Sequence, residues 1–280
     1  MISRKDILVK NMHAFEEKHR ILRQANDFIF FLPHPGLREY ISSYTVTFPT
    51  NENIPDSYTI MPDKGAMLFI EDDRKGLSAT LYGAAAKPSV IDNLTGMLVI
   101  IMFQPVGLYA LTGINQNELT SKIVPFDAVS PILCKLIFEA IEKAGSVYDL
   151  MTSLDILLLT NMKKAYPSQL KFAIINTINC AGNTTVKKLS NDIYYSERQL
   201  NRIFEQYVGV NVKSLLRLVR VDNAYQLLEN NYDTITTISD TLGFYNLPHF
   251  IQDFKSLCGM TPQEYRNIMS DFYSERADHL

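Results

Sequence analysis

The chain has 280 residues, of which 46% are hydrophobic and 20% charged, and its formal net charge is −3. These values are ordinary for a soluble globular protein long enough for two domains, and they do not by themselves indicate a nucleic-acid binder. The longest apolar run, Met97–Phe103, is far shorter than the roughly 20 residues of a membrane-spanning helix, so no membrane partner is expected. Three widely spaced cysteines, Cys134, Cys180 and Cys258, argue against a disulfide framework and against a cysteine-rich zinc site.

Residues 1–26 combine polar side chains with scattered apolar positions and predict an N-terminal tail or a short helix. The charged start, Met1–Asp6, has no apolar segment behind it, so no targeting signal is recognisable. Isolated cysteines are typical of a reducing compartment. We therefore expect a cytoplasmic protein.

Residues 27–128 have the composition of a β-rich domain, because short runs of β-branched and aromatic residues alternate with Pro, Gly, Asn and Asp. Six runs predict strands: Phe28–Leu32, Tyr40–Phe48, Ser57–Met61, Ala66–Ile70, Ala79–Tyr82 and Met97–Phe103. Short strands at close spacing favour an antiparallel barrel or sandwich.

Aromatic residues are frequent in this β-rich region. They are Phe30, Phe31, Tyr44, Phe48, Tyr58, Phe69, Tyr82 and Phe103. Such a set either lines a ligand cavity or forms an ordinary core, and the core is the more common outcome. The histidines, at positions 13, 19, 34, 249 and 278, do not cluster, so no metal and no other cofactor is expected.

Residues 129–166 follow a helical pattern. In Ile132–Ile141 the apolar residues recur along a single helical stripe, and a second apolar stretch covers Tyr148–Leu159. These helices either cover the β-rich domain or form a dimerisation surface, and the two interpretations are compatible. Pro167 interrupts the pattern and Ser168 can cap the next helix, so we place the domain boundary there.

An internal repeat at an offset of 50 residues is the most informative feature of the sequence. In pairs, Leu200, Phe204, Gly209 and Leu215 correspond to Phe250, Phe254, Gly259 and Tyr265. Ser196 likewise corresponds to Asn246, and both residue types are favoured N-caps. Each copy therefore predicts a capped helix that ends near a glycine able to adopt the left-handed conformation.

A short helix precedes each of these capped helices, Thr185–Asp192 in the first copy and Ile235–Leu242 in the second. The turns between them are Ile193–Tyr195 and Gly243–Tyr245. A short helix, a tight turn and a capped second helix form the helix-turn-helix pattern. Two such units on one rigid domain suit duplex DNA, because adjacent major grooves on one face lie about 34 Å apart. A helical bundle that binds no nucleic acid is the alternative, which two matched copies disfavour.

Two capping boxes mark helix starts in this region. In Ser196–Gln199 the side chain of Gln199 is expected to reach back to the Ser196 amide. Thr261–Glu264 is a second box, with Pro at the first helical position, and it starts a last helix.

Between the repeats, the apolar spacing of Asn211–Asn230 predicts a long helix that joins the two units. Residues 168–270 are therefore expected to form an all-α domain, followed by a polar C-terminal tail at 271–280. The predicted fold class is α+β multidomain: an N-terminal antiparallel β barrel or sandwich with trailing helices, and a C-terminal all-α domain with two helix-turn-helix motifs joined by a long helix.

The C-terminal motifs follow one another in a defined order and spacing. They are Ser196-x3-Leu200-x3-Phe204-x4-Gly209, Arg220-x3-Ala224-x2-Leu227-Leu228, Ile235-x2-Ile238, Gly243-Phe244, Phe250-x3-Phe254-Lys255 and Gly259-x-Thr261-Pro262-x2-Tyr265-Arg266. This pattern resembles the DNA-binding domain of the AraC/XylS family of bacterial transcription regulators, from about Leu170 to Ile268. The resemblance implies that the helices beginning near Ser196 and Asn246 read DNA.

The resemblance assigns a set of DNA-binding residues to the first motif. They are Ser196, Arg198, Gln199, Asn201, Arg202 and Lys213. Arginine can pair bidentately with guanine and asparagine with adenine, which suits Arg198, Asn201 and Arg202 to base reading. Ser196 and Lys213 suit phosphate contacts, which set register without reading sequence. A solvated helix face is the alternative for each single position.

The second motif departs from the family pattern. Its candidate DNA-binding residues are Asn246, His249, Gln252 and Lys255. The family usually has arginine at the position of Gln252, and small or polar residues at those of Leu247 and Pro248. We therefore expect the first motif to dominate sequence specificity.

The N-terminal half also carries a weaker set of motifs, between residues 28 and 128. They are Tyr40-Ile41-x2-Tyr44, Pro62-Asp63-Lys64-Gly65, Leu81-Tyr82-Gly83, Lys87-Pro88 and Phe103-Gln104-Pro105-x-Gly107-x2-Ala110-Leu111. They resemble the β-rich sensing domain that precedes the DNA-binding unit in a subset of the same family. The resemblance does not settle what this domain binds.

Taken together, these features predict a sequence-specific transcription regulator controlled through its N-terminal effector and dimerisation domain. The expected partners are double-stranded DNA, a second copy in a homodimer, a small-molecule effector and RNA polymerase. Residues 171–268 hold ten basic and nine acidic residues, so the basic groups must gather on one face if DNA is bound.

The alternative is an interaction protein that keeps the helix-turn-helix fold but binds DNA weakly and acts through a protein partner. An enzyme is not expected, because no nucleophile–base constellation stands out. Some relatives add alkyl-group repair through a cysteine-rich zinc module, which three scattered cysteines cannot build.

Overall fold

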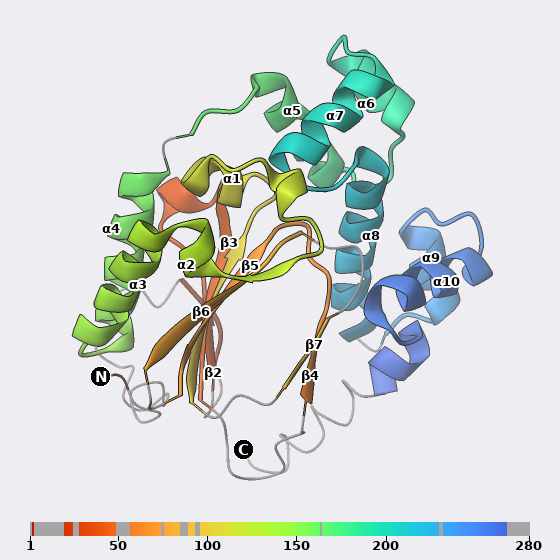
Figure 1. Ribbon diagram of the computed structural model, residues 1–280. Coiled ribbons are helices and arrows are strands. Elements are labelled where there is room, and N and C mark those ends of the chain that lie inside the picture. Colours follow the sequence, from red (N-terminus) through yellow and green to blue (C-terminus); the bar gives the residue numbers. More distant parts are fainter. Residues whose placement is uncertain are drawn as a thin grey trace.

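The computed structural model describes residues 2, 20–24, 28–48, 57–73, 76–84, 89–92, 96–162, 164–229 and 232–267. A central β-sheet separates two groups of helices, of which α3 and α4 lie on one side and α8, α9 and α10 on the other (Figure 1). Among these described residues, no helix is both long and apolar enough to cross a membrane.

The main sheet has seven antiparallel strands in the order β1-β2-β3-β8-β5-β6-β9, and a separate pair is formed by β4 and β7. The strands are β1 (Ile21–Gln24), β2 (Phe28–Phe31), β3 (Ile41–Thr47), β4 (Ser57–Ile60), β5 (Met67–Asp72), β6 (Leu77–Tyr82), β7 (Ser89–Asp92), β8 (Met97–Phe103) and β9 (Ile123–Pro125). All six predicted strands are confirmed, with bounds shifted by one or two residues.

Three strands, β1, β7 and β9, were not predicted from the sequence. The prediction of a tail or short helix is wrong at Ile21–Gln24, which forms β1 and pairs with β2. β7 and β9 are only four and three residues long. Such short strands carry little periodic signal, and they exist because a neighbouring strand supplies the hydrogen-bond partners.

The N-terminal half also contains helices, of which α3 and α4 pack on one face of the sheet. They are α1 (Gly107–Thr112), α2 (Phe126–Val129), α3 (Pro131–Lys143) and α4 (Val147–Asn161), with 3-10 helices η4 (Pro35–Leu37) and η5 (Gln116–Glu118). Leu133, Leu150 and Leu154 of α3 and α4 belong to the same core as Val99 and Ile101 of β8. The interpretation that the two predicted helices cover the β-rich domain is therefore confirmed.

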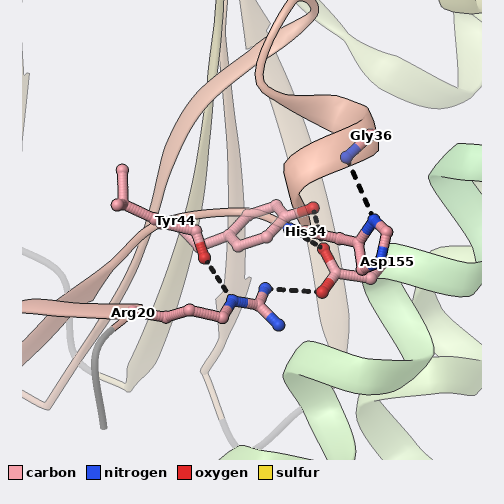
Figure 2. A network of polar contacts seen from close by, with 6 residues as sticks. Arg20, His34, Gly36, Tyr44 and Asp155 are labelled. Atoms are coloured by element: carbon pink, nitrogen blue, oxygen red, sulfur yellow. Dashed lines mark hydrogen bonds and ion pairs between the residues drawn. The ribbon is translucent and has the colours of Figure 1, made fainter. Parts of the chain in front are cut away.

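A buried ion pair fixes α4 to the sheet (Figure 2). The Arg20 guanidinium donates to Asp155 Oδ2 at 2.5 Å, and the Tyr44 hydroxyl donates to Asp155 Oδ1 at 3.0 Å. The backbone amide of His34 donates to the same Oδ1 at 3.0 Å. Burial, together with the neighbouring Asp155 carboxylate, raises the pKa of Tyr44 well above its ordinary value. Because every charge here has partners, the pair can be buried without leaving an uncompensated ion.

The C-terminal domain is all-α, as predicted. Its helices are α5 (Ser168–Asn179), α6 (Val186–Asp192), α7 (Glu197–Tyr207), α8 (Val212–Glu229), α9 (Ile235–Thr241) and α10 (Leu247–Cys258), and residues 262–267 are also helical. Leu215 and Val219 of α8 belong to the core of the first motif, whereas Ala224 and Leu228 belong to the core of the second. One long helix therefore supports both motifs, and the α+β multidomain fold class is confirmed.

Candidate DNA-binding surface

The two helix-turn-helix units have the same design with turns of different length. The first turn consists of Ile193, Tyr194 and Tyr195, and the second of the four residues from Leu242 to Tyr245. The offset between the copies is consequently 49 residues for α6 and α9 and 50 residues for α7 and α10. Each turn contains one left-handed residue, Tyr194 with φ 59° and Gly243 with φ 69°.

Matched caps begin both candidate recognition helices, α7 and α10. The Ser196 hydroxyl accepts from the Gln199 amide at 3.2 Å, and the Asn246 side chain accepts from the His249 amide at 2.9 Å. Among the described residues, the reciprocal bond from the Gln199 side chain is not formed, whereas the box at Thr261–Glu264 is complete, with bonds of 2.6 and 3.2 Å. These caps satisfy amides that a helix start leaves unpaired and fix where each recognition helix begins.

The first recognition helix buries one side and exposes the other. Leu200, Ile203 and Phe204 are buried against α8, while Arg198 and Arg202 are exposed one turn apart. Ser196 and Gln199, at the start of the helix, and Lys213, in the first turn of α8, are also exposed. The structure thus places five of the six predicted residues of the first motif at the surface.

Asn201 is the exception, because it is half-buried and its side chain is hydrogen-bonded within the domain. Its Nδ2 donates to the Glu197 carbonyl at 3.0 Å, and its Oδ1 accepts from the Val212 amide at 3.2 Å. The side chain is therefore occupied in joining α7 to the start of α8. Asn211 supplies a neighbouring cap, since its Oδ1 accepts from the Ser214 amide at 2.9 Å. Sequence spacing alone could not reveal this, because the partner amide lies eleven residues away.

Two cations near the first motif were missed by the sequence reasoning. Lys187 and Lys188 are exposed on α6, the helix that precedes the first recognition helix. Consecutive lysines at the start of the first helix of a helix-turn-helix unit are the signal that could have identified them, because that helix crosses the phosphate backbone in such motifs.

The second recognition helix presents a different surface. All four candidates, Asn246, His249, Gln252 and Lys255, are exposed. Leu247 is half-buried and packs against the core of the motif, which explains an apolar residue at this position. Within the described helix α10, Lys255 is the only basic residue apart from His249, whose ring lies 5.8 Å from that of Phe244.

The two motifs are held together by contacts that cross α8. The Arg217 guanidinium lies 2.9 Å from Asp253 Oδ1 and donates to the Ser256 hydroxyl of α10 at 2.8 Å. The Arg220 guanidinium lies 4.8 Å from the centre of the Phe244 ring. The second turn also abuts the first motif, because a Cβ on Gly243 would lie 2.6 Å from Asn183 Nδ2. These contacts join the two motifs through α8 and leave both recognition helices exposed at the surface.

Comparison with known proteins agrees with this geometry. Residues 189–268 match a helix-turn-helix domain family, and residues 29–125 match a family described as a domain of unknown function, DUF6597. The chain is 33% identical over 87 residues to the uncharacterised HTH-type transcriptional regulator YisR of Bacillus subtilis, covering 31% of this chain and 30% of that protein. It is 35% identical over 83 residues to the HTH-type transcriptional activator RhaR of Escherichia coli K12, covering 30% and 29%.

Among solved structures, an AraC-type DNA-binding regulator from Chromobacterium violaceum is 26% identical, with a TM-score of 0.34, covering 36% of this chain and 92% of that one. The chain spans about a third of the length of the curated relatives it matches. In each relative the match is with a named HTH-type regulator, and in this chain the C-terminal match falls on the tandem motifs described above. In its C-terminal domain, the chain is therefore similar to helix-turn-helix transcriptional regulators.

Proposed function

We propose that this protein is a sequence-specific DNA-binding transcription regulator whose promoter binding is controlled through its N-terminal domain. The observation that carries the proposal is the tandem of motifs joined through α8, in which both capped recognition helices expose their polar side. Arg198 and Arg202 can each donate bidentately to guanine O6 and N7, and such a contact is worth about 1–3 kcal/mol of discrimination. The domains are proposed as residues 27–128 for sensing, 129–166 for dimerisation and linkage, and 168–270 for DNA binding.

Phosphate contacts are assigned to the rim of the first motif. Ser196 and Lys213 flank the exposed side of α7, and Lys187 and Lys188 extend the basic surface over α6. Such contacts supply affinity and register, while the arginines supply the sequence preference. Asn246, His249, Gln252 and Lys255 form the second, less basic reading surface.

A small-molecule effector is proposed to act at the sheet face opposite α3 and α4. We call this surface the inner apolar face, and it comprises Ile60, Met67, Phe69, Tyr82, Leu98, Ile100 and Met102. Four of its seven members, including Tyr82, are only partly buried, whereas Phe31, Tyr44 and Phe103 are fully buried in the main core. Phe69 and Tyr82 thus belong to a second, partly buried apolar surface apart from the main core, which suits a mainly apolar ligand.

A homodimer is proposed through α3 and α4. These helices expose apolar side chains on the side away from the sheet, namely Ile132, Leu136, Ile156 and Leu159, with exposures of 74, 38, 61 and 40%. An exposed apolar stripe on two adjacent helices favours association with an equivalent stripe. RNA polymerase is proposed as the further partner of the DNA-bound dimer.

Selection from random-sequence DNA tests the proposed function. The full chain is expected to enrich one motif, and the variant R198A/R202A is expected to lose that enrichment while remaining folded. A control variant, R38A/K122A, removes two exposed positive charges from the N-terminal half outside α3 and α4 and should select the same motif as the unmodified chain. Failure of the unmodified chain to enrich any motif, with and without cell extract, would overturn the proposal.

A second candidate function is an interaction protein that uses the helix-turn-helix fold to bind a protein partner. The specific observation in its favour is the weakly basic surface of the second motif, where Pro248, His249 and Gln252 are exposed. Regulation of a target promoter that survives the R198A/R202A substitution would favour this function, because direct reading by the first motif would then be unnecessary.

A further inference from the structure

The sensing domain holds the first helix-turn-helix motif at the end of its recognition helix. The Thr120 hydroxyl donates to the Gly209 carbonyl at 2.5 Å, and the Tyr109 and Tyr207 rings meet edge to face at 4.5 Å. A Cβ on Gly209 would lie 3.2 Å from the Gln116 carbonyl oxygen, so the approach of the two backbones is close. These contacts leave the predicted reading residues of α7 exposed.

The second motif is reached by a different part of the sensing domain, the segment Ile60–Met67, which we call the connector. Ile60 packs within the inner apolar face, and the next residue, Met61, packs against the core of the second motif. Lys64 then lies 2.6 Å from Asp222 Oδ2 of α8. At Met67 the chain returns to the inner apolar face. One segment of eight residues therefore contacts both the candidate effector surface and the DNA-binding domain.

The connector is firmly anchored to the sheet. A Cβ on Gly65 would lie 2.0 Å from the Phe103 carbonyl oxygen, which only a glycine permits, and the Phe103 amide donates to the Ala66 carbonyl at 2.9 Å. Pro62 restricts the backbone on the other side of the charged pair. The C-terminal part of the connector is therefore fixed to β8.

The charged part of the connector depends on both domains. Lys64 is 16% exposed and Asp63 10% exposed, and the Asp63 carboxylate lies 3.9 Å from the Lys64 ammonium. Burial alone disfavours the charged ammonium, but Asp63 and Asp222 outweigh it and raise the pKa of Lys64. The Lys64 charge is thus shared between a carboxylate of its own domain and one of α8, and separation of the domains would leave it with only the first.

We propose that the connector couples the inner apolar face to α8, so that a ligand on that face changes how the second helix-turn-helix motif is held. This inference deepens the proposed function and rests on it for its biological meaning. A ligand that displaces Ile60 also displaces Met61 and Lys64, which contact the second motif and α8. The first motif keeps its own contacts at Tyr207 and Gly209, so the change is concentrated on α8, α9 and α10.

Hydrogen exchange of the full chain, followed by mass spectrometry without DNA, tests the coupling. The variants D222N and M61A are each expected to raise exchange in α8–α10 by about five-fold, the effect of losing roughly one half-buried contact, while α5–α7 change little. D240N is the matched control, because it removes one exposed acidic charge from α9 of the same domain. Exchange in D222N equal to that in D240N would overturn the proposal.

A second arm measures transmission from the inner apolar face. I100A removes side-chain volume from that face on β8, outside the connector, and is expected to raise exchange in α8–α10 in the unmodified background. In the M61A/D222N background it should have no further effect there, because the coupling has been removed. An undiminished effect of I100A in that background would refute the connector. Because DNA is absent, these outcomes are independent of the selection experiment, whose failure would overturn the proposed function alone.

Discussion

The two helix-turn-helix motifs share a scaffold and differ in the surface they present. Phe204 and Phe254 are both fully buried, and Ser196 and Asn246 cap their helices in the same way. The exposed positions have diverged, since α7 carries two arginines on its exposed side and α10 carries one lysine. The comparison shows that the apolar and capping positions specify the motif, whereas its chemistry toward a partner is set by positions that packing leaves free.

The turns differ in a way that the cores do not. Gly243 takes the left-handed conformation, which glycine adopts without steric cost, and the Asn183 side chain lies beside it. Tyr194 takes the same conformation with a side chain that is 96% exposed, so nothing packs against it. The first turn therefore holds a large residue at the position where the second turn has a glycine next to another side chain.

The largest effect is expected from breaking the shared core. F204A and F254A should each lower the free energy of unfolding by about 3–5 kcal/mol, because both rings are fully buried. Urea denaturation followed by circular dichroism measures this, with the 92% exposed Tyr245 as the control site, where Y245A should cost little. A loss in only one of the two phenylalanine variants would mean that the motifs are not equivalent in their packing.

The next largest effect is expected on base discrimination, where the two recognition helices should differ. R202A should weaken discrimination at one base pair by about 1–3 kcal/mol, and Q252A should weaken it less, because a single amide on a weakly basic helix replaces a guanidinium. Fluorescence anisotropy with the selected duplex and its single-base variants measures both. An equal or larger loss for Q252A would reverse the proposed dominance of the first motif.

A smaller effect is expected from substitution of Asn201. The result distinguishes a role in joining α7 to α8 from a role in reading bases. N201A should destabilise the domain by about 1 kcal/mol, because the Val212 amide loses the side chain that caps it. Thermal unfolding of the full chain measures the loss. Unchanged stability combined with altered base preference would mean that Asn201 reads bases.

The smallest effect on stability is expected at the turns of the two helix-turn-helix motifs, at Tyr194 and Gly243. Y194G should raise the free energy of unfolding by about 0.5 kcal/mol, because relief of the left-handed strain is partly offset by the flexibility of glycine in the unfolded chain. G243A should instead destabilise the domain, since its Cβ would press on Asn183. Equal responses at the two turns in thermal unfolding would contradict the distinction drawn here.

Local patterns in the sequence were sufficient for most of the fold. The repeat identified both motifs, because buried apolar residues, caps and terminal glycines recur at fixed spacing within a helix. The sequence pattern did not reveal β1, β7 and β9, which are short and become strands through pairing with another strand. It also did not reveal that the Asn201 side chain bonds the Val212 amide, since that amide belongs to the next helix.

The sequence by itself determined where α7 and α10 begin and which of their residues are buried, because caps and apolar spacing act within one chain segment. Only the tertiary structure decided how the two motifs meet through Arg217 and Asp253, and how Ile60–Met67 joins the sheet to α8. These contacts link residues that lie far apart in the sequence, so no periodic pattern in one segment indicates them. They arise from the packing of separate elements against one another, which a local sequence pattern does not contain.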